Sequence, residues 1–214
     1  MNQITTCPEW EYKDVAGSGD VLAKRAEGIL VSLHASSRSS GPAAIEDTRP
    51  LHGRYFADLT PPFLPYFAGH YRGEDFMCLR DYEVSIAMNP LVGHVAGSVP
   101  IEMREFRNEL FAALSNLDFV WAVNERVVTK AMKFRRLAET IALLFAKFLE
   151  IHPYANGNGH MARFMALWIF SRYGIHPRAF PLHGRPPDPP YSLAIRAYQQ
   201  GNLSPLADLL LECI

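Results

Sequence analysis

HPYANGNGHMAR, residues 152–163, joins two segments that carry helical hydrophobic spacing. In the upstream segment the apolar residues recur every three or four positions, at Leu137, Ile141, Leu144, Phe145 and Phe148. This pattern predicts a helix from Lys130 to Ile151. Pro153 ends it, because proline disfavours the α conformation of the residue before it. A second helix is predicted from about Gly159 to Tyr173, with Gly174 just after its C-terminus.

The loop between these two helices has the composition of an anion-binding site. Gly157 and Gly159 permit backbone angles that other residues resist, so the chain can curl and direct its N–H groups inward. The first turn of the following helix adds unpaired N–H donors and the positive end of the helix dipole. Arg163 lies one turn into that helix and can hold a phosphate with two hydrogen bonds. His152, at the loop entrance, can take a proton from an incoming hydroxyl.

This constellation resembles the signature of the Fic family, H-x-F-x-[D/E/N]-G-N-G-R-x-x-R between two helices. Two further stretches, LHGRYFADL (residues 51–59) and AGHYRG (residues 68–73), look like the segment that precedes the family's flap. The last 24 residues, YSLAIRAYQQGNLSPLADLLLECI (residues 191–214), look like its closing helices. The resemblance therefore extends over roughly residues 45–214.

The resemblance implies a mainly α fold, a Fic-type helical bundle with a short β-hairpin flap. Residues 1–40 are expected to form an N-terminal extension with a helix from about Asp20, and residues 41–214 the Fic domain. Hydrophobic spacing and turn residues predict further helices over residues 44–59, 101–116, 117–128 and 191–200, and a last helix that begins at Ser204.

The expected flap lies within residues 78–100. Tyr82, Val84 and Ile86 alternate with polar or small residues before Asn89-Pro90, which predicts a short hairpin or an extended flap. By the resemblance, the segment from Val84 to Val99 holds a stretch of the target protein by strand-like pairing. By analogy, Tyr71 and Arg72, which precede this segment, are expected to face the nucleotide.

The resemblance also implies an activity. Fic proteins typically cleave the pyrophosphate bond of a nucleotide and pass the nucleotidyl part, most often AMP from ATP, to a Ser, Thr or Tyr hydroxyl of a target protein. The primary hypothesis is therefore a protein adenylyltransferase that uses ATP as co-substrate and Mg²⁺ as cofactor. Transfer of a phosphoryl group or of another nucleotide stays open within this class. The alternative is a catalytically degenerate Fic domain that binds a nucleotide or a partner protein without turnover.

Carried over position by position, the motif assigns a role to each residue of the loop. His152 is the general base that deprotonates the target hydroxyl, and Asn156 occupies the position of the magnesium contact. Arg163 holds the outer phosphates. Tyr154 replaces the usual phenylalanine and is expected to point into the core and anchor the loop. The anion hole around the nucleotide phosphates is formed by Gly157, Asn158 and Gly159.

Two positions depart from the residue types that suit the family's chemistry best, although the pattern itself admits asparagine at position 156. His160 stands where the motif has its first arginine, and histidine is charged only below about pH 6.5. Loss of a charged phosphate contact costs about 1.5–3 kcal/mol, unless His160 is protonated or another donor replaces it. On this interpretation the rate peaks near neutrality or slightly below and falls on the alkaline side. Asn156 offers Mg²⁺ a neutral amide oxygen, so most of the metal's binding would come from the nucleotide phosphates.

The sequence also bears on how the site is inhibited and on whether it binds zinc. Many family members are inhibited by a helix with the pattern [S/T]-x-x-x-E-[G/N], and no clear copy occurs here. Either a separate small antitoxin-like protein is the inhibitor, or the altered motif makes inhibition unnecessary. A zinc site made of His152 and His160 is disfavoured, because their separation of eight residues fits no common zinc pattern.

Composition argues against nucleic-acid binding, membrane association and secretion. The 214 residues carry a formal net charge of −1, so no overall electrostatic attraction to nucleic acid or to an anionic membrane is expected. No membrane span or secretory signal is expected either. The three cysteines, Cys7, Cys78 and Cys213, form no CxxC pair and are expected to be reduced thiols. We therefore expect a cytoplasmic protein, in the producing cell or delivered to another cell as an effector.

Overall fold

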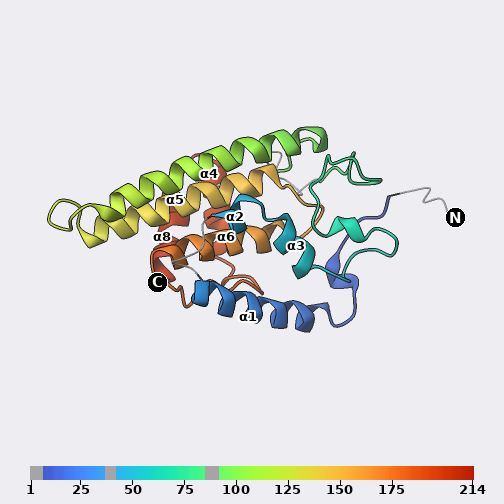
Figure 1. Ribbon diagram of the computed structural model, residues 1–214, viewed down its shortest axis with the longest axis horizontal. Coiled ribbons are helices and arrows are strands. Elements are labelled where there is room, and N and C mark those ends of the chain that lie inside the picture. The colour runs from blue at the N-terminus through green and yellow to red at the C-terminus, as the bar shows by residue number, and fades with distance from the viewer. Residues whose placement is uncertain (1–6, 37–41, 85–91) are drawn as a thin grey trace.

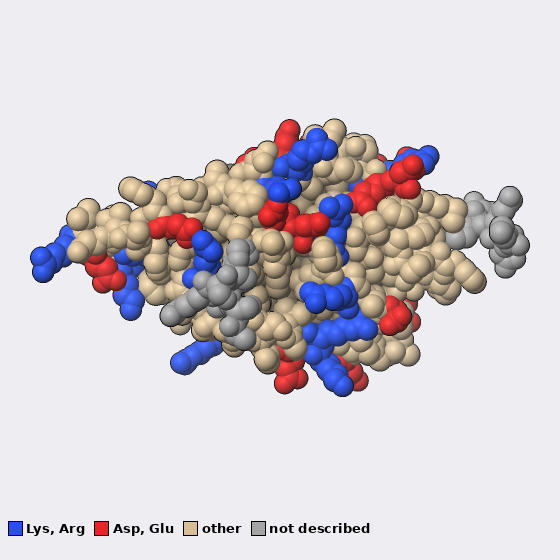
Figure 2. Space-filling view, in the orientation of Figure 1, with Lys and Arg blue, Asp and Glu red and all other residues tan. Residues whose placement is uncertain are grey.

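The computed structural model describes residues 7–36, 42–84 and 92–214, and within them the chain is helical (Figure 1). The α-helices are α1 (Ser18–Ser36), α2 (Ala43–Glu46), α3 (Arg49–Tyr55), α4 (Val99–Ala122), α5 (Lys130–Ile151), α6 (Asn158–Arg172), α7 (Tyr191–Gln199) and α8 (Ser204–Glu212). Three short 3₁₀ helices are η1 (Tyr12–Asp14), η2 (Pro65–Phe67) and η3 (Ala96–Ser98). None of the helices described is long and apolar enough to span a membrane. On the face shown in Figure 2, Lys and Arg side chains lie interspersed with Asp and Glu side chains.

Helix α5 lies at the centre of the bundle. It begins at Lys130 and is capped by Thr129, whose Oγ1 accepts a hydrogen bond from the backbone N–H of Met132 at 3.3 Å. Its main packing partners are α4, α6 and α8, and α4 runs antiparallel beside it in Figure 1. Because α5 and α6 are both packed into the core, the loop that joins them is held at a fixed place.

The mainly α prediction is confirmed, with two corrections to the helix bounds. One continuous helix, α4, replaces the two predicted over residues 101–116 and 117–128. The chain has no glycine or proline after Pro100 within α4, and Leu110, Leu114 and Leu117 continue one buried stripe through the expected break. The helix predicted over residues 44–59 is instead split into α2 and α3, where Asp47 adopts an extended conformation.

The predicted hairpin falls partly on residues 85–91, which lie outside the described residues. The described parts of the segment from Val84 to Val99 contain no strand: Ala96–Ser98 is a 3₁₀ helix and Val99 already belongs to α4. The backbone N–H groups of Gly93 and His94 donate instead to the carbonyls of Glu150 and Ile151, at 2.9 and 3.3 Å. This part of the flap is thus attached to the C-terminal end of α5.

The N-terminal residues share the core of the molecule. Leu22, Ala26 and Leu33 of α1 are buried in the same hydrophobic cluster as the residues of α5 and α6. Trp10 belongs to that cluster too and is only 3% exposed. The boundary placed at residues 40 and 41 stays a prediction, but α1 packs on the bundle and does not stand apart from it (Figure 1).

The cysteine prediction is wrong for two of the three residues. Cys7 and Cys78 form a disulfide that links positions 71 residues apart, and Cys213 is a free, buried thiol. Sequence spacing could not reveal the pair, because only the fold brings the two Cα atoms to 5.4 Å. The disulfide attaches the start of the chain to the segment that precedes the flap.

Reduction of this disulfide is expected to lower the free energy of unfolding by about 2–4 kcal/mol, since the cross-link restricts a long loop of the unfolded chain. Urea unfolding of the wild type with and without a reducing agent measures this difference. The Cys7→Ser variant serves as the control, because its stability should not respond to the reductant. Equal stability of the oxidised and reduced wild type would contradict the expectation.

Candidate active site

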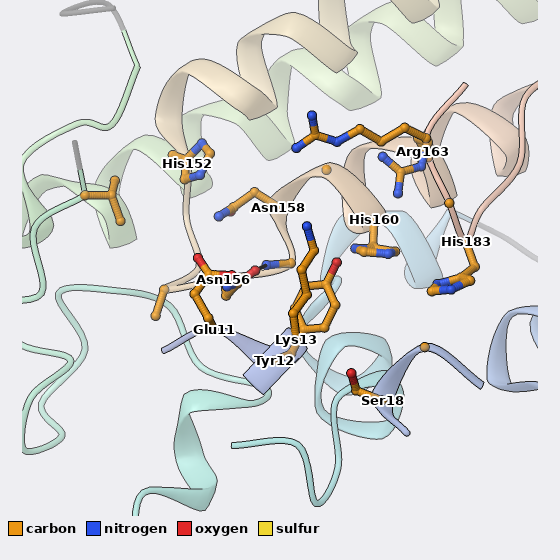
Figure 3. A pocket seen from close by; sticks show the side chains of 17 residues that line it. Glu11, Tyr12, Lys13, Ser18, His152, Asn156, Asn158, His160, Arg163 and His183 are labelled. Carbon is orange, nitrogen blue, oxygen red and sulfur yellow. Dashed lines mark hydrogen bonds between the residues drawn. The ribbon is translucent and has the colours of Figure 1, made fainter. Parts of the chain in front are cut away.

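The loop between α5 and α6 forms one wall of a cavity of about 680 Å³ (Figure 3). His152 and the loop residues line this wall, and Gly184 and Arg185 line the cavity from the segment before α7. A third wall comes from the start of the chain. We call residues 7–14 the N-terminal strap; its Glu11, Tyr12 and Lys13 face the loop across the cavity.

His152 has the geometry of a general base. It ends α5 in the left-handed conformation, with φ at 54°. Its Nδ1 lies 3.1 Å from the carbonyl oxygen of Leu149. A carbonyl can only accept, so Nδ1 carries the proton and Nε2 keeps its lone pair. Burial lowers the pKa of His152 to about 4, against a small opposing effect of the Leu149 hydrogen bond. The imidazole is therefore neutral and able to accept a proton at physiological pH.

Arg72 fixes the backbone on which His152 stands. Its side chain is fully buried, and its guanidinium donates to four backbone carbonyls, those of His152 (2.8 Å), Tyr82 (2.9 Å), His94 (2.9 Å) and Ile151 (3.2 Å). Two of these carbonyls belong to the end of α5, where the helix dipole is negative. The expectation that Arg72 faces the nucleotide is wrong, because it lies beneath the loop and not in the cavity.

Tyr71 is likewise not at the cavity. It is buried, and its ring lies 5.1 Å from that of Tyr154. Tyr154 is fully buried as the sequence predicts, with its hydroxyl 2.7 Å from Thr48 Oγ1 and its ring stacked on that of His52 at 3.8 Å. These contacts anchor the loop in the core.

The curl of the loop depends on Gly157. Its φ is +82°, and a Cβ at this position would lie 2.3 Å from Cε2 of Phe56, so no other residue fits without displacing the ring. Next to it, the buried His52 braces the loop. His52 Nδ1 accepts from the backbone N–H of Gly69, so its Nε2–H donates to the carbonyl of Asn156, each at 2.9 Å.

Asn158 holds the loop through its side chain. Its amide oxygen accepts from the backbone N–H of Tyr154, and its amide nitrogen donates to the carbonyl of the same residue, both at 2.8 Å. The side chain is nearly fully buried and therefore shapes the loop from within. In the first turn of α6 the N–H groups of His160 and Met161 donate to the carbonyl of Gly157, and the N–H of Gly157 donates to Asn156 Oδ1. Anion binding by the N–H groups of Asn158 and Gly159 stays a prediction.

Asn156 fastens the loop to the N-terminal strap. Its Nδ2 donates to the backbone carbonyl of Trp10 at 2.7 Å, and its Oδ1 accepts from the N–H of Gly157 at 2.6 Å. A neutral oxygen that already accepts a hydrogen bond is a poor partner for Mg²⁺. Across the residues described, no group of three or more His, Cys, Asp or Glu side chains is placed to hold a metal.

His160 does not act as a cation in the free protein. It is 6% exposed and packs against the rings of Tyr12, Tyr55, Phe56 and His183. Burial, together with the charge of nearby Arg163, lowers the pKa of His160 to about 2. This environment favours the neutral form of His160 near neutral pH, a point that the sequence left open.

The cavity nevertheless has a positive lining. Arg163 lies at its inner end, 3% exposed, and its Nε and Nη2 donate to the carbonyl of Leu182 at 3.2 and 3.1 Å. Arg185 and Lys13 also line it, while Glu11 is the one acidic side chain among the described lining residues. The arrangement suits an anion with several charges, such as a polyphosphate.

Sequence reasoning missed the N-terminal strap and His52, and it gave Arg72 the wrong role. The pattern of the strap carries no helical or strand periodicity, and His52 lies on a short helix with no spacing partner. One signal was present: LHGRYFADL and AGHYRG place His52 and Arg72 in stretches that already looked like the family. Their roles as supports of the loop appear only when the side-chain partners are known.

Comparisons with known proteins identify the family of this chain and a solved structure with a similar fold. The model of the Fic/DOC family matches residues 44–170, and the chain therefore belongs to this family. Among solved structures, the fold is similar to the crystal structure of BepC, a VirB-translocated effector protein from Bartonella tribocorum, with bound AMPPNP. The TM-score is 0.52 at 18% sequence identity, over 91% of this chain and 86% of that chain. No curated protein matches this sequence.

Proposed function

We propose that this protein is a protein adenylyltransferase, which transfers AMP from ATP to a Ser, Thr or Tyr hydroxyl of a target protein. Membership of the Fic/DOC family supports a nucleotide-dependent transferase. The observation that carries the proposal is the state of His152: a neutral imidazole with its Nε2 lone pair available, in the same cavity as the glycine loop and Arg163. BepC, similar in fold, was solved with AMPPNP bound.

In the proposed reaction the target hydroxyl attacks the α-phosphorus of ATP and a new O–P bond forms. The bond between the α-phosphorus and the bridging oxygen breaks, and pyrophosphate leaves. His152 Nε2 takes the hydroxyl proton, which makes the oxygen a stronger nucleophile. Arg163 and the N–H groups at the start of α6 stabilise the negative charge on the phosphates.

Mg²⁺, when bound, neutralises phosphate charge, and the nucleotide phosphates would supply most of its ligands in this protein. The flap segment from Val84 to Val99 is proposed to hold the target protein, since Val84 lines the cavity and Gly93 is attached to the end of α5. Control by a separate antitoxin-like protein and action in a cytoplasm, native or foreign, remain parts of the same proposal.

The test is incubation of the purified protein with Mg²⁺, cell lysate and ATP labelled on the α-phosphate or, separately, on the γ-phosphate. Protein-bound label from the α-phosphate alone is the expected result. Label from the γ-phosphate alone would replace the proposal with phosphoryl transfer. ATP binding without label from either position would replace it with the second candidate function.

That second candidate, a Fic domain that binds a nucleotide without turnover, is favoured by two observations. His160 is neutral, and the oxygen of Asn156 is engaged within the loop. Restoring arginine at position 160 does not separate the two functions cleanly, because His160 is buried among the rings of Tyr12, Tyr55 and Phe56 and a longer, charged side chain would disturb that packing. A direct comparison of ATP binding with label transfer in the wild type does separate them.

The pH profile of the reaction follows from the two histidines. The lowered pKa of His152, about 4, means that the base loses its function only in acid, as pH falls toward that value. His160, with a pKa of about 2, has no charge to lose on the alkaline side. We therefore expect kcat/KM to be flat from about pH 6 to about pH 9, in place of the predicted maximum near neutrality. A fall of tenfold or more between these values would contradict this assignment.

A further inference from the structure

The N-terminal strap forms part of the cavity wall and is held there by hydrogen bonds to the rest of the protein. Trp10 is its anchor: the backbone N–H donates to the hydroxyl of Tyr82 at 3.1 Å, and the indole Nε1 donates to the carbonyl of Leu59 at 2.7 Å. The carbonyl of Trp10 accepts from Asn156, and the disulfide of Cys7 fastens the strap three residues earlier. Residues 11–13 follow this anchor, and the ring of Tyr12 packs on the rings of Phe56 and His160.

Both departures from the family motif face this strap. The amide of Asn156 donates to the carbonyl of Trp10, which a carboxylate at this position could not do. The ring of His160, which is 6% exposed, meets the ring of the half-buried Tyr12, with the ring centroids 5.6 Å apart. Both unusual residues thus contact the strap.

The strap also places a positively charged side chain, that of Lys13, in the cavity. Lys13 lines the cavity, and Figure 3 shows its side chain directed into the space between Asn158 and His160. Over residues 7–36, 42–84 and 92–214, no carboxylate lies within ion-pair distance of its ammonium group. The lysine is exposed, so the ammonium keeps its freedom to meet an anion that enters.

We propose that Lys13 supplies the cationic phosphate contact that the loop lacks at position 160. His160 is neutral and buried among rings, so it contributes no charge to the site. Arg163 approaches the cavity from α6, and Lys13 approaches from the opposite wall. A nucleoside triphosphate between them would contact a positive group on each side. This inference rests on the proposed function for the identity of the ligand, and on the cavity lining for its charge.

The test compares Lys13→Met with Lys24→Met, which removes an exposed lysine from α1 outside the cavity. Binding of three probes is measured by calorimetry: ATP, adenosine and inorganic tripolyphosphate. We expect Lys13→Met to weaken ATP and tripolyphosphate by about tenfold and to leave adenosine within about twofold. Lys13→Arg should restore most of the loss, and Lys24→Met should behave as the wild type.

Three outcomes overturn the inference: unchanged ATP and tripolyphosphate binding in Lys13→Met, an equal loss for ATP and adenosine, or tighter binding, which would make the strap an obstruction. The proposed function fails separately. Tripolyphosphate binding that depends on Lys13, without label transfer from ATP, would support this inference and overturn the transferase. Label transfer that is unchanged in Lys13→Met would support the transferase and overturn this inference. A wild type that binds none of the three probes would overturn both.

Discussion

The His152→Ala variant is expected to lose label transfer by about 10²–10⁴-fold, because it removes the group that accepts the hydroxyl proton. In the proposed reaction the neutral Nε2 of His152 is the proton acceptor. Nucleotide binding should change little, since on the same proposal the phosphates are held by Arg163, Lys13 and backbone N–H groups and not by this ring. The effect is therefore expected in kcat, measured with ATP labelled on the α-phosphate.

A control variant must separate loss of the imidazole from backbone strain at position 152. Position 152 has a φ of 54°, which alanine adopts at a cost of about 1–2 kcal/mol. Asparagine tolerates this conformation better, so His152→Asn separates loss of the base from strain at the end of α5. We expect both variants to lose activity equally. Substantial transfer by His152→Asn would mean that the imidazole is not the base.

The Arg72→Met variant is expected to lower the free energy of unfolding by about 3–5 kcal/mol. A methionine fills the space but leaves four carbonyls without their donor, those of Tyr82, His94, Ile151 and His152. For a chain of this size the loss corresponds to a fall in Tm of about 6–20 °C. Thermal and urea unfolding measure it directly.

The matched control is Arg80→Met, which removes an arginine whose side chain is 64% exposed and pairs with Asp75 on the surface. We expect it to cost less than about 1 kcal/mol. Arg72 also has an effect on the site, because its Nε holds the carbonyl of His152. Arg72→Lys, with fewer donors, should recover part of the stability. A loss below 1 kcal/mol in Arg72→Met would show that these carbonyls find other partners.

Local sequence patterns are sufficient for much of the fold. The apolar repeat from Leu137 to Phe148 predicts α5, and Pro153 predicts its end, because both effects act within a few residues of chain. The glycine at position 157 similarly predicts a curled loop, and its φ of +82° agrees. Where the local pattern was ambiguous, as at the join between residues 116 and 117, the buried stripe of α4 decided the outcome.

The charge state of the site residues depended on the tertiary structure. From sequence, His152 and His160 are the same residue type with the same ordinary pKa, and a protonated His160 was a reasonable hypothesis. In the fold, burial keeps both neutral, and the Leu149 carbonyl selects the tautomer of His152. Burial and hydrogen-bond partners are properties of neighbours in space, so no spacing rule could supply them.

The sequence by itself determined the helical class, the curled glycine loop between two helices and the identity of the candidate base. Only the tertiary structure decided what supports them: Arg72 beneath His152, and the strap that joins Trp10 to Asn156 across 146 positions of chain. It also joined Cys7 to Cys78 and brought Lys13 to the cavity. The physical reason is the range of the interactions. Helix periodicity and glycine conformation act over a few residues, whereas these contacts exist only after the chain has folded.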